Sequence, residues 1–164
     1  MTKERALKML RFIHSLLDAD RHADALQFCN EELTRTRGTD TATILKYRSY
    51  VRVDGGQIGS AILDLEEALK ICPTDRSVLH ALACTHAKAA DWASAIIAAE
   101  RLLFEEQACS SIYYLDEAYF ILAVGSEFLG DRVQAHRYAS LVSDGGSTWL
   151  GEFLTKDDLI TRLS

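Results

Sequence analysis

Four alanines, Ala25, Ala61, Ala95 and Ala135, recur at intervals that constrain the fold of this chain more than any other feature. Each lies near the start of an apolar, helix-forming run, and the intervals are 36, 34 and 40 residues. A self-similar period near ~34 residues is typical of proteins built from stacked helix pairs. Paired helices whose axes approach to about 8–10 Å leave room for little more than a methyl group at one contact. The pattern therefore predicts a stack of helical hairpins.

The composition and the breaks in the chain support this prediction. The 164 residues include one proline and nine glycines, and strand-like runs of alternating polarity are missing. Breaks such as Gly55-Gly56 and Gly130-Asp131 come a few residues before an alanine, where the chain must turn and cap the next helix. We predict an all-α fold with four helix pairs: 3–18 with 21–36, 40–53 with 57–72, 76–88 with 91–104, and 111–129 with 131–142.

The helix expected over 40–53 has an ambiguous buried face. In the simplest register Arg48 and Arg52 lie near core positions. A shift by one residue would instead bury Ile44, Tyr47 and Val51, side chains that a core accepts. Both registers remain open at this point.

The end of the chain is expected to close the stack, because an open end of a repeat array needs a cover. Trp149, Phe153, Leu159, Ile160 and Leu163 are the apolar side chains of this capping segment. A capping box formed by Thr155 and Asp158 would start its helix. Before the fourth pair, the long link over residues 105–115 predicts either a longer second helix or an ordered loop.

Three stretches resemble the turn and second helix of a tetratricopeptide repeat (TPR). They are the run 55–61 with Leu65, Ala68 and Pro73 behind it, the run 91–95, and the run 130–135. The resemblance covers about four degenerate repeats, approximately 6–39, 42–75, 76–109 and 116–149, with a cap over 150–164, in a single domain of residues 1–164. It implies a right-handed superhelix, a TPR-like α-solenoid, whose concave groove is lined by the first helix of each pair.

The same resemblance implies which side chains would bind a partner in that groove. The groove candidates are His14, Leu17, Lys46, Tyr50, His80, Cys84, Ala87, Glu117, Phe120, Val124 and Glu127. Tyr113 joins them, because it lies in an aromatic pair at the long link and exposed aromatic residues are favoured interface anchors. Any one of these side chains could instead pack against a neighbouring helix. Lys46 stands alone, without the cluster of Lys, Arg and Asn with which members of the family hold the acidic tails of chaperones.

Charge and motif content argue against several other functions. The formal net charge is −6, with 24 acidic and 18 basic residues, which disfavours a nucleic-acid backbone as partner. His80 and Cys84 have a spacing that could hold zinc, but no third ligand is evident. The acidic pairs are spread over helix surfaces, and phosphate loops and nucleophile motifs are missing. We therefore expect no catalysis, no metal and no cofactor.

Cysteine usage and hydropathy indicate the compartment. The four cysteines are widely spaced without a CxxC pair, which favours reduced, mostly packed thiols over disulfides. No run approaches the ~18 apolar residues of a membrane span. We expect a cytoplasmic protein without a membrane span.

These observations predict an adaptor or chaperone that binds another protein, or a peptide segment of one, in its groove. A bacterial secretion-system chaperone is the leading hypothesis. An immunity protein that neutralises a toxin domain is an alternative, because an acidic surface suits a basic target. A homo-oligomeric structural repeat protein, its groove filled by a neighbouring copy, is a third.

Overall fold

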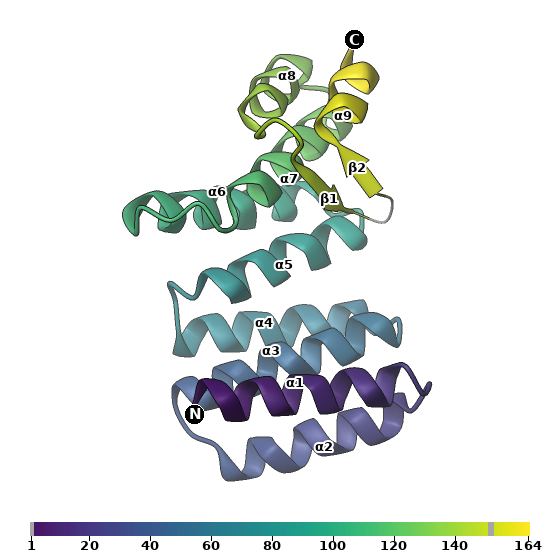
Figure 1. Ribbon diagram of the computed structural model, residues 1–164, viewed down its shortest axis with the longest axis vertical. Coiled ribbons are helices and arrows are strands. Elements are labelled where there is room, and N and C mark those ends of the chain that lie inside the picture. Colours follow the sequence, from purple (N-terminus) through teal and green to yellow (C-terminus); the bar gives the residue numbers. More distant parts are fainter. Residues whose placement is uncertain (1, 151–152) are drawn as a thin grey trace. The chain divides into compact units, whose positions relative to one another are not determined.

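The computed structural model describes residues 2–150 and 153–164, without the side chain of Trp149. In this part of the chain nine helices and one two-stranded hairpin follow one another (Figure 1). The elements are α1 (Lys3–Leu17), α2 (His22–Arg35), α3 (Thr39–Asp54), α4 (Ile58–Ile71), α5 (Arg76–Lys88), α6 (Trp92–Ala108), α7 (Leu115–Phe128), α8 (Arg132–Leu141), β1 (Ser147–Trp149), β2 (Phe153–Thr155) and α9 (Lys156–Leu163). The predicted helical fold is confirmed, and the helix ends differ from the predicted ones by four residues at most.

The four alanines occupy equivalent places. Each is the fourth residue of its helix, in α2, α4, α6 and α8, and each side chain is buried. Each backbone N–H donates to the carbonyl of the residue four positions earlier, at 3.0–3.1 Å. The period of the sequence therefore marks one recurring position at the start of every second helix.

The turn that precedes each alanine is also repeated. Asp20, Gly56, Ala90 and Gly130 adopt positive φ angles of 57°, 74°, 57° and 82°. In all four turns the following N–H donates to the carbonyl five residues back, at 2.7–3.0 Å, which closes the C-terminus of the first helix. Glycine adopts this conformation without strain. One turn geometry, used four times, thus produces the hairpins.

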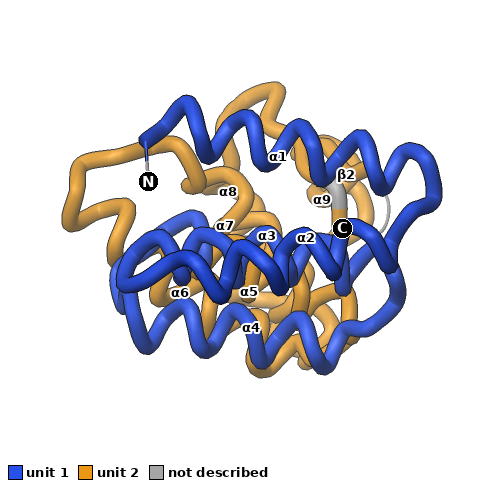
Figure 2. Tube along the Cα trace, turned by 90° about the horizontal axis from the view of Figure 1, so that it is seen from below, with its two compact units in different colours: residues 1–78 blue, residues 79–164 orange. Residues whose placement is uncertain are grey.

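The chain forms two compact units, residues 1–78 and 79–164, and the boundary falls within α5 (Figure 2). In the first unit α3 packs against α1, α2 and α4, around a core of Met9, Ile13, Leu16, Ala25, Cys29, Ile44, Tyr47 and Val51. In the second, α7 packs against α6 and α8, and the core contains Phe120, Ala123, Val124, Ala135, Ala139, Val142, Leu154, Leu159 and Leu163. The right-handed superhelix and the single domain stay predictions.

Helix α3 takes the shifted register. Ile44, Tyr47 and Val51 are buried, while Arg48 and Arg52 are half-buried at the edge of the helix. The Tyr47 hydroxyl also donates to the carbonyl of Ala6 on α1, at 3.2 Å. Burying the apolar side chains leaves both guanidinium groups able to reach a carboxylate, which decides the register.

That carboxylate is the buried Asp64 of α4. Its two oxygens lie 2.6 Å from Arg48 Nη2 and 2.7 Å from Arg52 Nη1. Arg48 also donates to the Asn30 side chain of α2, at 2.7 Å, and Arg52 to the carbonyl of Ser60, at 2.9 Å. The network joins α2, α3 and α4, because a buried carboxylate needs both charge and hydrogen-bond partners.

The C-terminal segment corrects part of the capping prediction. Leu159 and Leu163 are buried and the Thr155–Asp158 capping box is present, but Phe153 and Ile160 are exposed. Strands β1 (Ser147–Trp149) and β2 (Phe153–Thr155) pair antiparallel, and β2 directs Leu154 inward and Phe153 outward. Side chains alternate across a strand, so the prediction that Phe153 packs in the cap together with Leu159 and Leu163 was wrong, as it was for Ile160. The predicted packing of the Trp149 side chain lies outside the described residues.

The alanine contact can be tested by enlarging one side chain. Ala95→Leu should lower the free energy of unfolding by about 1–3 kcal/mol, because a larger side chain overpacks a buried crossing. The matched control is Ala93→Leu, two residues away on the exposed face of α6, which should change stability by less than about 0.5 kcal/mol. Urea denaturation followed by circular dichroism measures both; equal effects would contradict the assigned packing role.

The Asp64 network gives a second prediction. Asp64→Ala should destabilise the protein by about 3–5 kcal/mol, because it leaves two half-buried guanidinium groups without their carboxylate. Glu67→Ala on the same helix removes only an exposed pair with Lys70 and should cost less than about 1 kcal/mol. The denaturant midpoints of the two variants measure these losses of stability. If Asp64→Ala destabilises the protein no more than Glu67→Ala does, the network does not stabilise the fold.

Candidate functional site

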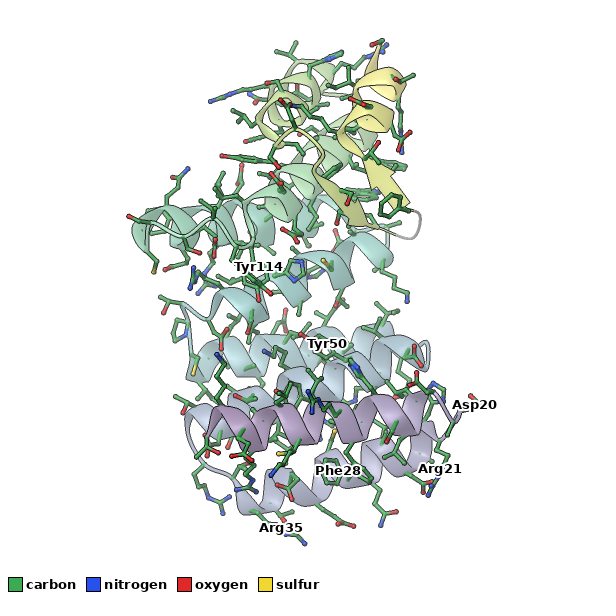
Figure 3. The ribbon with its side chains drawn as sticks, in the orientation of Figure 1. Asp20, Arg21, Phe28, Arg35, Tyr50 and Tyr114 are labelled. Atoms are coloured by element: carbon green, nitrogen blue, oxygen red, sulfur yellow. The ribbon has the colours of Figure 1, made fainter. Side chains whose placement is uncertain are left out.

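The structure brings four of the predicted site residues together in the second unit. His80 and Cys84 come from α5, Tyr113 from the loop before α7, and Glu117 from the first turn of α7. The ring of Tyr114, which is labelled in Figure 3, stacks on that of His80, and their centroids lie 4.8 Å apart. Tyr113 meets Tyr114 edge to face at 4.7 Å, and Cys84 Sγ lies 3.5 Å from His80 Nε2. We call His80, Tyr114 and Tyr113 the aromatic column.

A buried carboxylate holds this column in place. Glu106, near the end of α6, is fully buried, and its Oε2 accepts a hydrogen bond from the backbone N–H of Tyr114, at 3.1 Å. The carbonyl of Glu106 accepts from the N–H of Ser111, at 2.9 Å, just after Ser110 turns the chain with a φ of 51°. Glu106 therefore fixes the loop at both ends. The prediction that the pair Glu105-Glu106 is solvated helix surface was wrong for Glu106.

The long link over residues 105–115 contains both a longer helix and an ordered loop. Helix α6 continues to Ala108, and residues 109–114 then form the ordered connection to α7, so both predicted alternatives apply. Tyr114 is half-buried, while Tyr113 is 76 % exposed and the adjacent Ile112 is 81 % exposed. One tyrosine packs and its neighbour faces solvent, as their adjacency predicts.

Burial and like charges set the protonation of the neighbouring groups. Burial raises the pKa of the Glu117 carboxyl, and the Asp116 and Glu106 carboxylates raise it further. Burial, with a smaller contribution from Glu117, raises the pKa of the Cys84 thiol to about 12. A thiol of that pKa is protonated near neutral pH and is a poor nucleophile and metal ligand. Within the described residues no group of three or more His, Cys, Asp or Glu side chains could hold a metal ion.

The segment around the column is acidic throughout. Residues 102–131 contain Glu105, Glu106, Asp116, Glu117, Glu127 and Asp131, and no Lys, Arg or His. Besides Glu106, three of the six have a hydrogen-bond or ion-pair partner: Asp116 accepts from Ser143 N at 2.9 Å, Glu127 pairs with Arg162 at 2.8 Å, and Asp131 accepts from Gln134 N at 3.0 Å. Glu117 has no cationic partner in the described part of the chain.

The candidates of the first unit lie apart from this constellation in the sequence. Lys46 is half-buried; its Nζ donates to Ser77 Oγ at 2.7 Å and lies 5.6 Å from the Tyr47 ring centroid. Burial lowers the pKa of Lys46, and the charge of Asp75 opposes that shift. The half-buried ring of Tyr50 lies 6.4 Å from that of Tyr47 (Figure 3). His14 is exposed on α1.

Three groove candidates on α7 are engaged within the protein itself. Phe120 and Val124 are buried in the core of the second unit, together with alanines of α8 and leucines of α9. Neither side chain has surface to offer a partner, so the prediction that they contact one is corrected. Glu127 pairs with Arg162 of α9 and serves to attach the cap. The C-terminal cap and α8 together need an apolar face to pack on, and α7 supplies it.

A depression that the sequence analysis did not anticipate lies on the first helix pair. It has a volume of about 270 Å³ and is lined by Phe12, Leu16, Arg21, Asp24, Gln27, Phe28 and Glu31; Phe28 and Arg21 are labelled in Figure 3. The Phe12 and Phe28 rings meet edge to face at 4.9 Å. Its polar walls pair among themselves, Arg21 with Asp24 at 2.6 Å and Gln27 with Glu31 at 2.9 Å. Four of the polar side chains that line the depression are therefore already hydrogen-bonded to one another in two pairs.

Comparison with known proteins assigns the fold. The crystal structure of MamA is similar to this chain with a TM-score of 0.66 and 16 % sequence identity, over 81 % of this chain and 73 % of that one. No protein-family model matches the sequence, and no curated protein does. At this identity the similarity shows the fold alone, a TPR-like helical repeat. None of the described helices is both long and apolar enough to cross a membrane.

The charge of Glu117 gives a third prediction. Its pKa is raised in the folded protein, so the folded state holds the proton more tightly than the unfolded state does. Its contribution to stability therefore falls as the pH rises from the ordinary value of 4.5 through the raised pKa. Glu117→Gln should be more stable than the wild type at pH 7, and this advantage should vanish well below the ordinary pKa.

Urea denaturation at acidic and neutral pH measures the effect. Glu100→Gln, at an exposed position of α6, is the control and should match the wild type within about 0.5 kcal/mol at both pH values. A loss of stability in Glu117→Gln at neutral pH would mean that this carboxylate makes a stabilising interaction in the folded protein.

Proposed function

We propose that the protein is a protein-interaction adaptor that binds a partner protein or peptide segment through the aromatic column and Ile112. The observation that carries the proposal is the high exposure of Tyr113 and Ile112, 76 % and 81 %, beside a Tyr114 already fixed by His80 and Glu106. Exposed tyrosines are favoured interface anchors. An anchor held in position before binding loses less conformational entropy in the complex.

The chemistry of the site supports binding rather than a reaction. The Cys84 thiol beside His80 has a pKa of about 12, so little thiolate is present for nucleophilic attack. The His80 ring is engaged in the stack with Tyr114. A TPR-like fold is also typically a scaffold for protein interactions, which by analogy supports the same class of function.

Within this class, a cytoplasmic chaperone or accessory protein of a bacterial secretion system remains the leading hypothesis. Exposed apolar side chains such as Ile112 and Phe104 suit a client whose own apolar segment needs cover. The acidic segment 102–131 supports the second candidate, an immunity protein that binds a basic toxin domain. Static light scattering at several concentrations distinguishes both from a self-assembling repeat protein, whose mass would exceed that of a monomer in the absence of any partner.

Affinity capture with matched variants tests the proposal. The tagged full chain, captured from cells that express it and analysed by quantitative mass spectrometry, should lose its partners about tenfold on Tyr113→Ala and on Ile112→Ala. Val133→Ala is the control, because Val133 is 79 % exposed but lies on α8, away from the loop in sequence. If all three variants retain the same partners while folding normally, the aromatic column is not the binding site.

A further inference from the structure

We infer that the partner segment is basic, and that one of its arginine side chains stacks on Tyr113 near the acidic first turn of α7, which carries Asp116 and Glu117. This inference rests on the proposed function and adds the chemical class of the partner. The surface that carries it is the exposed end of the aromatic column. The charges around that surface determine what can occupy it.

The aromatic part of the site suits a flat cation. Tyr113 is largely exposed, and its ring is held edge to face against Tyr114, which in turn stacks on His80. A cation within about 6 Å of an aromatic centroid is attracted by the ring quadrupole. A ring that is already fixed by its neighbours presents that quadrupole without further ordering cost.

The electrostatic part of the site requires positive charge. Beside the column, the first turn of α7 carries Asp116 and Glu117, and the end of α6 carries Glu105 and the buried Glu106, while residues 102–131 contain no basic side chain. Glu117 is half-buried, faces the charges of Asp116 and Glu106, and has no cationic partner among the residues that the structure describes. A partly buried carboxylate without a counter-charge is unfavourable in the free protein. A cation brought by the partner removes this cost on binding, which gives the complementarity that selects a basic segment.

Among cations, arginine fits better than lysine or a metal ion. The guanidinium group is planar, stacks on aromatic rings, donates two parallel hydrogen bonds to a carboxylate and is weakly hydrated. The ammonium group of lysine is compact and strongly hydrated. A metal ion would need further ligands, and the nearby Cys84 thiol is protonated because its pKa is about 12.

Fluorescence anisotropy with short, terminally blocked peptides tests the inference on the full chain. The probes are a labelled peptide of alternating Arg and Ser, and its Lys–Ser and Glu–Ser counterparts. The arginine peptide should bind about fivefold more tightly than the lysine peptide, and the glutamate peptide should not bind. Tyr113→Ala and Glu117→Gln should each weaken the arginine peptide by about fivefold or more. Val133→Ala and Glu100→Gln should leave its affinity unchanged within about twofold.

Three results would overturn the inference. Equal weakening by Glu100→Gln and Glu117→Gln, with no effect of Tyr113→Ala, would show nonspecific attraction to an acidic protein. Equal affinity for all three peptides, or preference for the acidic one, would exclude a basic partner. Loss of captured partners in Tyr113→Ala without any binding of the arginine peptide would reject the basic segment and leave the adaptor function intact. Capture that does not depend on Tyr113 would instead reject the adaptor site itself.

Discussion

The burial of an alanine at the fourth position of every second helix is the constraint on which the rest of the structure depends. Ala25, Ala61, Ala95 and Ala135 are buried at the same position of their helices, each five residues after a turn with positive φ. The turn fixes where the second helix starts, and the small side chain lets it approach the first. Because turn and contact recur together, each hairpin presents its remaining apolar side chains in the same way. Stacked hairpins then bury those side chains.

Two buried carboxylates make contacts that are not part of the repeated hairpin pattern. Asp64 accepts from two arginines of α3 and so joins α2, α3 and α4 in the first unit. Glu106 accepts from the N–H of Tyr114 and so fixes the loop before α7 in the second. Both carboxylates are stable in the interior because donors meet them there. One supports the packing of helices, and the other supports a surface.

On that surface, adjacent residues of one short segment differ in their burial. Tyr114 packs on His80, whereas the adjacent Tyr113 and Ile112 are exposed. Glu117 is half-buried near the carboxylates of Asp116 and Glu106, which raises its pKa and lowers the stability of the folded protein when this carboxylate is charged. On the same helix, Phe120 and Val124 pack into the core. The first turn of α7 is thus partly exposed, whereas its later turns pack into the core.

The sequence by itself determined the helices, the hairpin turns and the capping box, since these depend on local propensity, on glycine and on the 34-residue pattern. It also named His80, Cys84, Tyr113 and Glu117 as candidate site residues, which the structure brings together while their role in binding stays a prediction. It could not show that Glu106 and Asp64 are buried, because a carboxylate on a helix face has the same local pattern whether water or a distant donor meets it. It also could not show that Phe120 is core or that residues 147–149 and 153–155 pair as strands. Those outcomes follow from contacts between segments far apart in the chain, and only the tertiary structure decides them.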